Sequence, residues 1–334
     1  MKTCHLIFLQ GISYMLKNLI SHYIKATNGK GQLPCLVAAD NELDILKLVT
    51  INKKQIETVL LNYGGILLRD FSIRAISEFN KLANIVSPNL VDYVNRSTPR
   101  TKLGGKLYTA TEYPPDRQIP FHNENSYTLT WPNKILFFSV IAATDGGETA
   151  ITDSRQVYNH IDKEIINEFN QKKIMYIRNY TPGIDLSWQE VFQTEEKSEV
   201  EDYCRNNSIA YEWKTSGVEL TTKQVCQATI KHPVTGEDIW FNQAHLFNIA
   251  SLSANDRDEL INLLGKDNLT RNSYYGDGSE IQKSHFDHIR QAYEKERIEF
   301  KWQKGDVMIL DNRLMAHSRN PFNGNRKVVV AMGD

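Results

Sequence analysis

The sequence lacks several features that mark specialised classes of protein. It has only four cysteines, Cys4, Cys35, Cys204 and Cys226, and no CxxC pair. This argues against a disulfide scaffold or a zinc knuckle and fits a reducing, cytoplasmic location. No apolar run approaches the roughly 18 to 20 residues that span a bilayer, so we expect no membrane segment. Lys+Arg 39 against Asp+Glu 40 gives a formal net charge of −1, whereas a sequence-independent nucleic-acid binder would need a basic excess.

The chain also lacks any mark of a domain boundary, because we find no repeat, no low-complexity segment and no Pro/Gly/Ser-rich linker. We therefore expect residues 1–334 to form a single domain, with an α/β N-terminal part over residues 1–100. The first 16 residues are mildly apolar, but His5, Gln10 and Gly11 interrupt them and no small-residue cleavage site follows. We expect a folded or frayed segment there, not a signal peptide.

The apolar periodicity changes along the chain. Helical spacing over residues 43–63 ends at Gly64-Gly65, a strand is predicted over residues 65–71, and a second helix over residues 72–86 has Ser72 as its predicted N-cap. After about residue 100, turn residues separate short β-rich runs. Strands are predicted at residues 106–111, 135–142, 148–152, 174–180, 237–242, 306–311 and 327–332. Helical patches lie near residues 156–171 and from Ser253 to Gly265. This pattern of short strands separated by turns, with two helical patches, predicts a mainly β fold with α insertions, a sandwich or barrel.

A candidate metal site lies in the stretch PFHNENSY, where His122 and Glu124 are two residues apart. On a strand or at its end, residues i and i+2 point to the same side. An imidazole and a carboxylate that face one point are two-thirds of the two-His-one-carboxylate ligand set of non-haem Fe(II) oxygenases. The sequence therefore predicts a metal site that needs one further histidine.

His317 is the candidate for that histidine. It follows an apolar strand at residues 307–310 and precedes a turn at residues 320–325, after which Arg326 opens the next strand. Two antiparallel strands joined by such a turn would bring His317 and Arg326 close together. An arginine in the same cavity as a metal suits a dicarboxylate, since a guanidinium binds a carboxylate through two charge-assisted hydrogen bonds.

The residues alone leave other interpretations open. A His/Glu pair at this spacing is common on protein surfaces, and His317 is equally compatible with a structural role. His285 and His288, at i and i+3 on a predicted helix, could share a metal instead.

The order of the motifs resembles the TauD/TfdA (taurine dioxygenase-like) family, and within it the SyrP-like branch of natural-product hydroxylases. The matching blocks are TATEYPPDRQIPFHNENSYTLTWP, DGGETAITDSR, HPVTGEDIWFNQAHLF and GDVMILDNRLMAHSRNPFNGNRKVVVAM. The resemblance runs from about residue 33 to residue 332. It implies a double-stranded β-helix, a jelly-roll core of two facing sheets over residues 101–334, with an insertion around residues 182–214.

The resemblance also implies an enzyme, a dioxygenase that uses Fe(II), with 2-oxoglutarate and O₂ as cosubstrates. His122, Glu124 and His317 would be the iron ligands, Arg326 would bind the distal carboxylate of 2-oxoglutarate, and Thr149 would hydrogen-bond the same molecule. Many relatives place the arginine further from the histidine and carry two arginines, so Arg319 and Lys327 are alternatives. Glu124 argues against a halogenase, which needs a small residue there, and hydroxylation of an unactivated C–H bond is the default.

The expected substrate is a small molecule, an amino acid or an amino-acid derivative, free or tethered to a carrier protein. Asn123 should point into the scaffold if its neighbours face the metal. The candidate substrate contacts are Asn125, Ser126, Arg117, Asn242, Gln243 and Arg319. Buried structural amides or loop residues bonded to the backbone are the alternative reading of these side chains. The insertion at residues 182–214 is a candidate lid or carrier-docking surface, or an ordinary solvated insertion.

Two other functions stay open. A cupin-type oxygenase or isomerase that needs no 2-oxoglutarate should lack an inward arginine at position 326. A non-catalytic binding protein on the same fold should have lost part of the group formed by His122, Glu124 and His317, and all three residues are present. The sequence does not define the oligomeric state.

Overall fold

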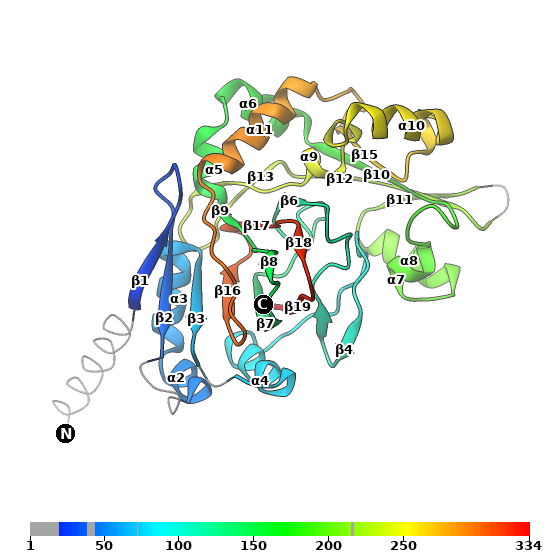
Figure 1. Ribbon diagram of the computed structural model, residues 1–334. Helices are drawn as coiled ribbons and strands as arrows, with labels where there is room; N and C mark the ends of the chain where they lie inside the picture. Colours follow the sequence, from blue (N-terminus) through cyan, green and yellow to red (C-terminus); the bar gives the residue numbers. More distant parts are fainter. Residues whose placement is uncertain (1–19, 39–43, 72, 215–216) are drawn as a thin grey trace.

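The computed structural model describes residues 20–38, 44–71, 73–214 and 217–334. The expectation for the first 16 residues lies outside this part of the chain, as does Ser72. Figure 1 shows sheets at the centre, with helices below them and above them. This confirms the prediction of a mainly β fold with α insertions. That the chain is a single domain stays a prediction.

The largest sheet has eight strands in the order β1-β2-β3-β16-β7-β19-β5-β4. Neighbouring strands are antiparallel except β2 and β3. Three of the strands come from the N-terminal part, so this sheet joins the two ends of the chain. The strands are β1 (Ile20–Lys25), β2 (Gln32–Val37), β3 (Gly65–Arg69), β4 (Lys102–Gly104), β5 (Leu107–Thr109), β7 (Lys134–Ile141), β16 (Val307–Asp311) and β19 (Lys327–Gly333).

Both faces of the central strands of this sheet are buried. In β7, Leu136 and Phe138 pack with helices on one face, whereas Ile135 and Phe137 belong to a second core on the other. This alternation is the period of two expected of a strand. Phe79 stacks on Phe138 with ring centroids 5.2 Å apart. The helices on this face are α2 (Ile45–Ile51), α3 (Lys53–Tyr63) and α4 (Ile76–Val86).

A smaller pair of sheets covers the other face. Ile151 of β9 and Met315 of β17 lie in the same hydrophobic cluster as Phe137 and Val330 of the large sheet. The three-stranded sheet has the order β6-β17-β9, and β8 pairs with β18. Two facing sheets thus enclose one core. The strands are β6 (Ile119–His122), β8 (Asp145–Gly146), β9 (Ile151–Asp153), β17 (Met315–Arg319) and β18 (Phe322–Asn323).

A third layer packs outside the small sheet, at the top of Figure 1. Phe121 and Ala316 of the small sheet contribute to its core, together with Phe169 and Phe286 of two helices. The helices are α5 (Ser154–His160), α6 (Lys163–Lys172), α9 (Ala244–Phe247), η1 (Ile249–Ser251), α10 (Ala254–Leu264), η2 (Lys266–Asn268) and α11 (Lys283–Lys295). The strands are β10 (Ile174–Tyr180), β12 (Leu220–Cys226), β13 (Thr229–Lys231), β14 (Asp238–Trp240) and β15 (Arg271–Tyr275).

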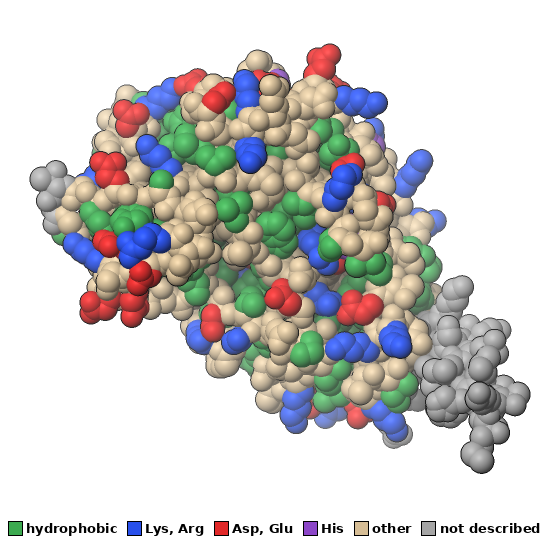
Figure 2. Space-filling view, turned by 180° about the vertical axis from the view of Figure 1, so that it is seen from behind, with side chains coloured by type: hydrophobic (Ala, Val, Ile, Leu, Met, Phe, Trp, Pro, Cys, Tyr) green, Lys and Arg blue, Asp and Glu red, His purple; other side chains and the backbone are tan. Residues whose placement is uncertain are grey.

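The predicted insertion contains α7 (Trp188–Phe192), α8 (Lys197–Asn206) and β11 (Ala210–Trp213). Its helices share a hydrophobic cluster that includes Trp188, Val191 and Val200, and β11 extends the sheet β11-β12-β10-β15. Figure 2 shows both signs of charge interspersed over the back of the molecule, with acidic side chains gathered at the end where α7 and α8 lie. The insertion is therefore a folded lobe, and its role as a lid or docking surface stays a prediction.

The structure corrects three predicted helices. The helix expected over residues 43–63 is two helices that meet at Asn52, whose side-chain amide donates to Leu48 O. The patch near residues 156–171 is also two helices, α5 and α6. Helix α4 begins at Ile76 with Ala75 as its N-cap, and the Glu78 carboxylate accepts from the Ala75 N–H.

The predicted strands are found with small shifts of their ends. The largest shift is at residues 148–152, where β9 begins only at Ile151. Helix α10 has Ser253 as its N-cap and Gly265 as its C-cap, as predicted. None of the helices in the described ranges is long and apolar enough to cross a membrane.

The contact between α4 and the large sheet gives a test of the fold. We expect Phe79→Ala to lower the free energy of unfolding by about 3–5 kcal/mol, because it removes a buried ring and leaves a cavity against Phe138. Guanidinium chloride unfolding measures this loss. Lys81→Ala, on the exposed face of the same helix, is the matched control, and an equal loss in both variants would contradict the packing described here.

Candidate active site

Three predicted residues come together between the sheets. His122 ends β6 and is directly paired in register with His317 of β17, and their ring centroids are 4.3 Å apart. Glu124 lies in the turn that follows β6. One ligand atom from each of the three residues lies within 4.8 Å of the others. Within the described ranges, this is the one group of His, Cys, Asp or Glu side chains with such geometry.

The prediction that His317 and Arg326 lie on two paired antiparallel strands is wrong. The strands on either side of the turn at residues 320–325 do not pair with each other: β17 pairs with β6 and β9, whereas β19 pairs with β5 and β7. Between them the chain crosses from the small sheet to the large one. His317 and Arg326 nevertheless line one cavity, because the two sheets face each other.

Both histidines are uncharged at neutral pH. Burial lowers the pKa of His122, and burial together with the nearby His122 and Arg100 lowers the pKa of His317 well below its usual value. The Nδ1 of His122 donates to Pro120 O at 2.9 Å, which leaves Nε2 with its lone pair free. His317 Nε2 lies 3.9 Å from Glu124 Oε2. Neutral imidazole is the form that binds metal.

Two buried asparagines fix the backbone around Glu124. Asn312 Oδ1 accepts from the Glu124 N–H at 2.7 Å, and its Nδ2 donates to Glu124 O at 3.0 Å and to Pro132 O at 2.8 Å. The Asn123 amide donates to Ser154 Oγ and to Asn312 O, so it points into the scaffold as predicted. Asn312 was not predicted as part of the site. Its position as a polar residue directly after the buried strand β16 was a sign visible in the sequence.

Arg100 was also not predicted as part of the site. Its Nη2 donates to Glu124 Oε2 at 2.7 Å, and both side chains are 3% exposed. Arg100 lies outside the ligand motifs, and no local pattern in the sequence distinguishes it from a surface arginine. Only the fold brings it to the carboxylate.

A second arginine faces the same cavity. Arg326 Nε donates to Gly147 O at 2.8 Å, and its Nη2 lies 3.3 Å from Thr149 Oγ1, which also accepts from Trp302 Nε1. Burial lowers the pKa of Arg326 to about 10, and Arg319 contributes to the lowering. The guanidinium keeps its charge at neutral pH in a site that has too little negative charge. Such a group favours an anionic ligand.

The cavity between these side chains has a volume of about 30 Å³, roughly the space of one water molecule. Three arginines are among the residues that line it. The residues that line this cavity include Arg100, His122, Thr149, His317, Arg319 and Arg326.

Two predicted substrate contacts are engaged elsewhere. The Arg319 guanidinium donates to the carbonyls of Tyr113, Pro114 and Arg117, so it holds the loop that precedes β6. Arg117 itself is exposed and lies 3.8 Å from Asp256 of α10. The structure does not bring Arg117 to the cavity lining.

Most of the predicted substrate contacts that carry an amide or a hydroxyl group also bond to backbone carbonyls. Ser126 Oγ and Gln243 Nε2 both donate to Asn123 O, and Asn242 Nδ2 donates to Ala228 O. These bonds match the structural alternative that the sequence left open. Asn125 differs, because its Oδ1 is buried without a hydrogen-bond partner among the described residues, and its φ of 56° is unusual for a residue other than glycine.

The alternative histidine pair has separate partners. His285 Nδ1 lies 3.2 Å from Tyr275 OH, and His288 Nε2 accepts from the Asp162 N–H. The structure therefore does not bring these two imidazoles together as a metal site.

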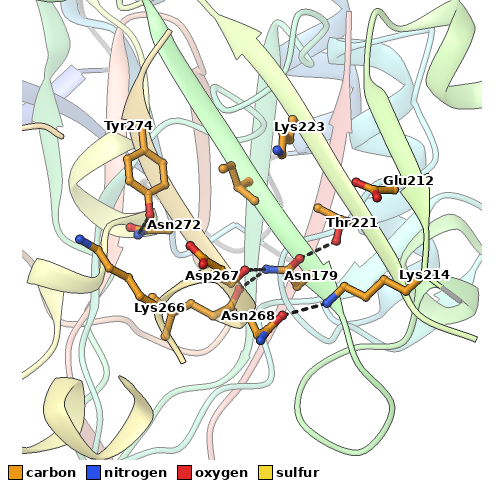
Figure 3. A pocket seen from close by; sticks show the side chains of 12 residues that line it. Asn179, Glu212, Lys214, Thr221, Lys223, Lys266, Asp267, Asn268, Asn272 and Tyr274 are labelled. Atoms are coloured by element: carbon orange, nitrogen blue, oxygen red, sulfur yellow. Dashed lines mark hydrogen bonds between the residues drawn. The ribbon is translucent and has the colours of Figure 1, made fainter. Parts of the chain in front are cut away.

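A larger cleft, of about 260 Å³, lies on the sheet β11-β12-β10-β15. Figure 3 shows its polar side chains bonded to one another: Asn179 accepts from Thr221, and Lys214 donates to Asn268. It shares no lining residue with the cavity at His317. The size of this cleft alone does not make it the active site.

Comparison with known proteins settles the family. A family model described as "Taurine catabolism dioxygenase TauD, TfdA family" matches residues 29–332. The chain belongs to the TauD/TfdA family. It is 46% identical over 279 residues to the dapdiamide synthesis protein DdaC of Enterobacter agglomerans, covering 84% of each chain. It is 27% identical over 294 residues to a clavaminate synthase-like protein of Arabidopsis thaliana, covering 85% of this chain and 86% of the relative.

Solved structures show the same fold. PvcB of Pseudomonas aeruginosa, described as an Fe, alpha-ketoglutarate dependent oxygenase from an isonitrile synthetic pathway, aligns with a TM-score of 0.54 at 11% identity over 93% of this chain and 89% of its own. A putative alpha-ketoglutarate dependent 2,4-D dioxygenase from Burkholderia xenovorans aligns with a TM-score of 0.52 at 13% identity, covering 93% and 97%. The predicted jelly-roll core is thereby confirmed. The SyrP-like branch stays a resemblance of motifs.

The chain is an enzyme of the dioxygenase class, and the enzymes of its family use Fe(II), 2-oxoglutarate and O₂. The donor set fits this chemistry, since two neutral imidazoles and one carboxylate are the ligands that non-haem Fe(II) oxygenases use. The buried guanidinium of Arg326 fits a carboxylate cosubstrate in the same way.

The Asn312 contacts give a test of this scaffold. We expect Asn312→Ala to lower the free energy of unfolding by about 3 kcal/mol, because three buried hydrogen bonds of roughly 1 kcal/mol each are lost. Thermal or chemical unfolding of the metal-free protein measures the change. Asn325→Ala, at an exposed position in the turn before Arg326, should unfold like the unmodified protein. Wild-type stability of Asn312→Ala would show that Glu124 is held by other contacts.

Proposed function

We propose that this dioxygenase hydroxylates an unactivated C–H bond of an amino acid or an amino-acid derivative. His122, Glu124 and His317 hold Fe(II), and Arg326 with Thr149 binds 2-oxoglutarate. The observation that carries the proposal is one buried cavity that contains both the three-residue donor group and the Arg326 guanidinium.

Each residue has a task that its chemistry supports. When bound, the iron together with 2-oxoglutarate and O₂ supplies the oxidation of the C–H bond, and the keto acid leaves as succinate and CO₂. The two histidines offer neutral nitrogen atoms at neutral pH, so metal binding there does not require the loss of a proton from either ring. Arg326 pairs with the distal carboxylate of 2-oxoglutarate. Thr149 orients the guanidinium and this carboxylate, since its hydroxyl already contacts the guanidinium.

Two observations support the substrate class. The relative that is 46% identical is a dapdiamide synthesis protein, and the motifs resemble natural-product hydroxylases, so we place the reaction in natural-product biosynthesis. Asn125, with a buried carbonyl oxygen that lacks a partner among the described residues, is the proposed substrate contact. The substrate is free or carrier-tethered, and assays of both forms distinguish the two. The described cysteines Cys35, Cys204 and Cys226 are free, which supports a cytoplasmic location.

The alternatives make different predictions. An oxygenase or isomerase on this fold without a keto acid has no use for a buried arginine beside the metal group, and Arg326 lies there. A non-catalytic protein has no reason to keep all three donors around one point, and they lie within 4.8 Å. Both observations favour the 2-oxoglutarate-dependent reaction.

The first test is an anaerobic titration of the metal-free protein with Fe(II) and then with 2-oxoglutarate. We expect the weak visible metal-to-ligand charge-transfer band of this class, which requires both iron and a bidentate keto acid. Iron binding without the band would favour the oxygenase that needs no keto acid.

We expect His122→Ala to abolish Fe(II) binding and activity, because two ligands do not form the site. Isothermal titration calorimetry under anaerobic conditions measures the loss. His288→Ala, which alters a histidine outside the site, is the control and should bind iron normally. Iron binding that survives in His122→Ala would remove this residue from the ligand set.

We expect Arg326→Gln to raise the dissociation constant of 2-oxoglutarate about tenfold or more, because charge-assisted hydrogen bonds are worth roughly 1.5–3 kcal/mol. Fe(II) affinity should stay nearly unchanged, since Arg326 does not contact the donor group. Titration of the charge-transfer band gives both constants. Unchanged 2-oxoglutarate affinity would transfer the role to Arg319 or Lys327.

A further inference from the structure

Arg100 contacts the donor group and has no part in the function proposed so far. Its Nη2 donates to Glu124 Oε2 at 2.7 Å. The same oxygen lies 3.9 Å from His317 Nε2. The arginine therefore holds the oxygen that faces the histidine.

The rest of the Arg100 side chain has its own supports, so Glu124 alone does not determine its position. The guanidinium lies over the ring of Tyr93 at 4.4 Å from the centroid, and Nη1 lies 4.0 Å from Met332 Sδ. The Arg100 carbonyl accepts from Arg96 Nη1 at 3.2 Å.

The segment that carries Arg100 is anchored to the lobe of α7 and α8. The Asn95 N–H donates to Val191 O at 3.1 Å, and Gln193 Nε2 donates to Tyr93 O at 2.6 Å. Asn95 O accepts from Tyr127 OH at 2.7 Å. The segment that leads to Arg100 is thus placed by contacts that do not involve the donor group.

The Glu124 side chain has fewer constraints. Asn312 fixes its backbone, but the carboxylate still has three side-chain torsions to set. Among the described residues, the contacts of the carboxylate oxygen atoms are with Arg100 and His317. An outer partner that orients a ligating carboxylate typically affects metal affinity 10- to 100-fold.

We propose that Arg100 is a positioning residue that holds the Glu124 carboxylate toward His317, so that the three donors are arranged before the metal binds. This inference rests on the proposed role of Glu124 as a ligand. Arginine suits the task because it stays protonated at any working pH and its planar fork holds a fixed direction. In the metal-free protein it also supplies the positive charge that a buried carboxylate requires.

Arg100 acts on metal affinity in two opposite ways, so the sign of the change in affinity when it is removed shows which effect is larger. A cation bonded to the carboxylate repels an incoming metal ion, so an arginine that only neutralised Glu124 would weaken metal binding. Its removal would then raise the affinity. If positioning dominates, removal lowers the affinity.

The experiment compares Arg100→Met and Arg100→Lys with the unmodified protein, using Co(II) as the probe. We expect Arg100→Met to lower Co(II) affinity by tenfold or more in anaerobic calorimetry, and Arg100→Lys to recover part of it. The visible spectrum of the Co(II) protein should change in Arg100→Met, because it reports how the ligands are arranged. Arg205→Met, which removes an exposed arginine of α8, should match the unmodified protein in both measurements.

Stability gives a second readout. Arg100→Met leaves Glu124 buried without its cation, so the thermal midpoint of the metal-free variant should fall. Co(II) should raise this midpoint by less than in the unmodified protein, because the variant binds the metal more weakly. If Arg100→Met does not fold without metal, Arg100→Lys carries the test through its affinity and spectrum.

The outcomes separate the two proposals. Equal or higher Co(II) affinity in the Arg100 variants, with an unchanged spectrum, overturns the positioning role and leaves the metal site intact. Absence of Co(II) and Fe(II) binding in the unmodified protein overturns the proposed function itself.

Discussion

The burial of the Glu124 carboxylate is the constraint on which the rest of the site depends. A carboxylate that is 2% exposed loses most of its hydration, and this loss is unfavourable unless cations and hydrogen-bond donors replace the water. Arg100 supplies the charge at 2.7 Å, and Asn312 satisfies the backbone on both sides of the residue. His317, beside them, is neutral for the same reason, since burial disfavours its charged form. Burial thus has two consequences here: the carboxylate needs Arg100 and Asn312 beside it, and the imidazole of His317 stays neutral.

The two-sheet architecture explains how distant parts of the sequence supply these groups. β6 and β17 are neighbours in the small sheet, so their direct register pairs His122 with His317. Arg326 directly precedes β19 of the large sheet and lines the same cavity. The central strands of the large sheet are packed on both faces, by helices on one side and by the small sheet on the other. The two histidines lie on paired strands, whereas Glu124 and Arg326 lie in short connections directly next to strands.

The sequence pointed to His122, Glu124 and His317, which the structure brings together, and their role as iron ligands stays a prediction. His122 and Glu124 share a side at a spacing of two, and motif order supplied His317, Arg326 and the fold. The hairpin argument for Arg326 was wrong, because a turn in the sequence does not show whether the chain stays in one sheet. Arg100 and Asn312 were missed, since their contacts with Glu124 are long-range. Arg319 and Gln243 have suitable side chains, but only the structure shows that they bond to backbone carbonyls.

The positive charge of the cavity connects stability with function. Arg100 is balanced by Glu124, whereas burial lowers the pKa of Arg326 to about 10, with Glu148 acting in the opposite direction. The lowered pKa means that burial disfavours the charged guanidinium, so an anion that binds beside it removes an unfavourable interaction. Any anion that binds there in the folded protein and not in the unfolded chain stabilises the fold.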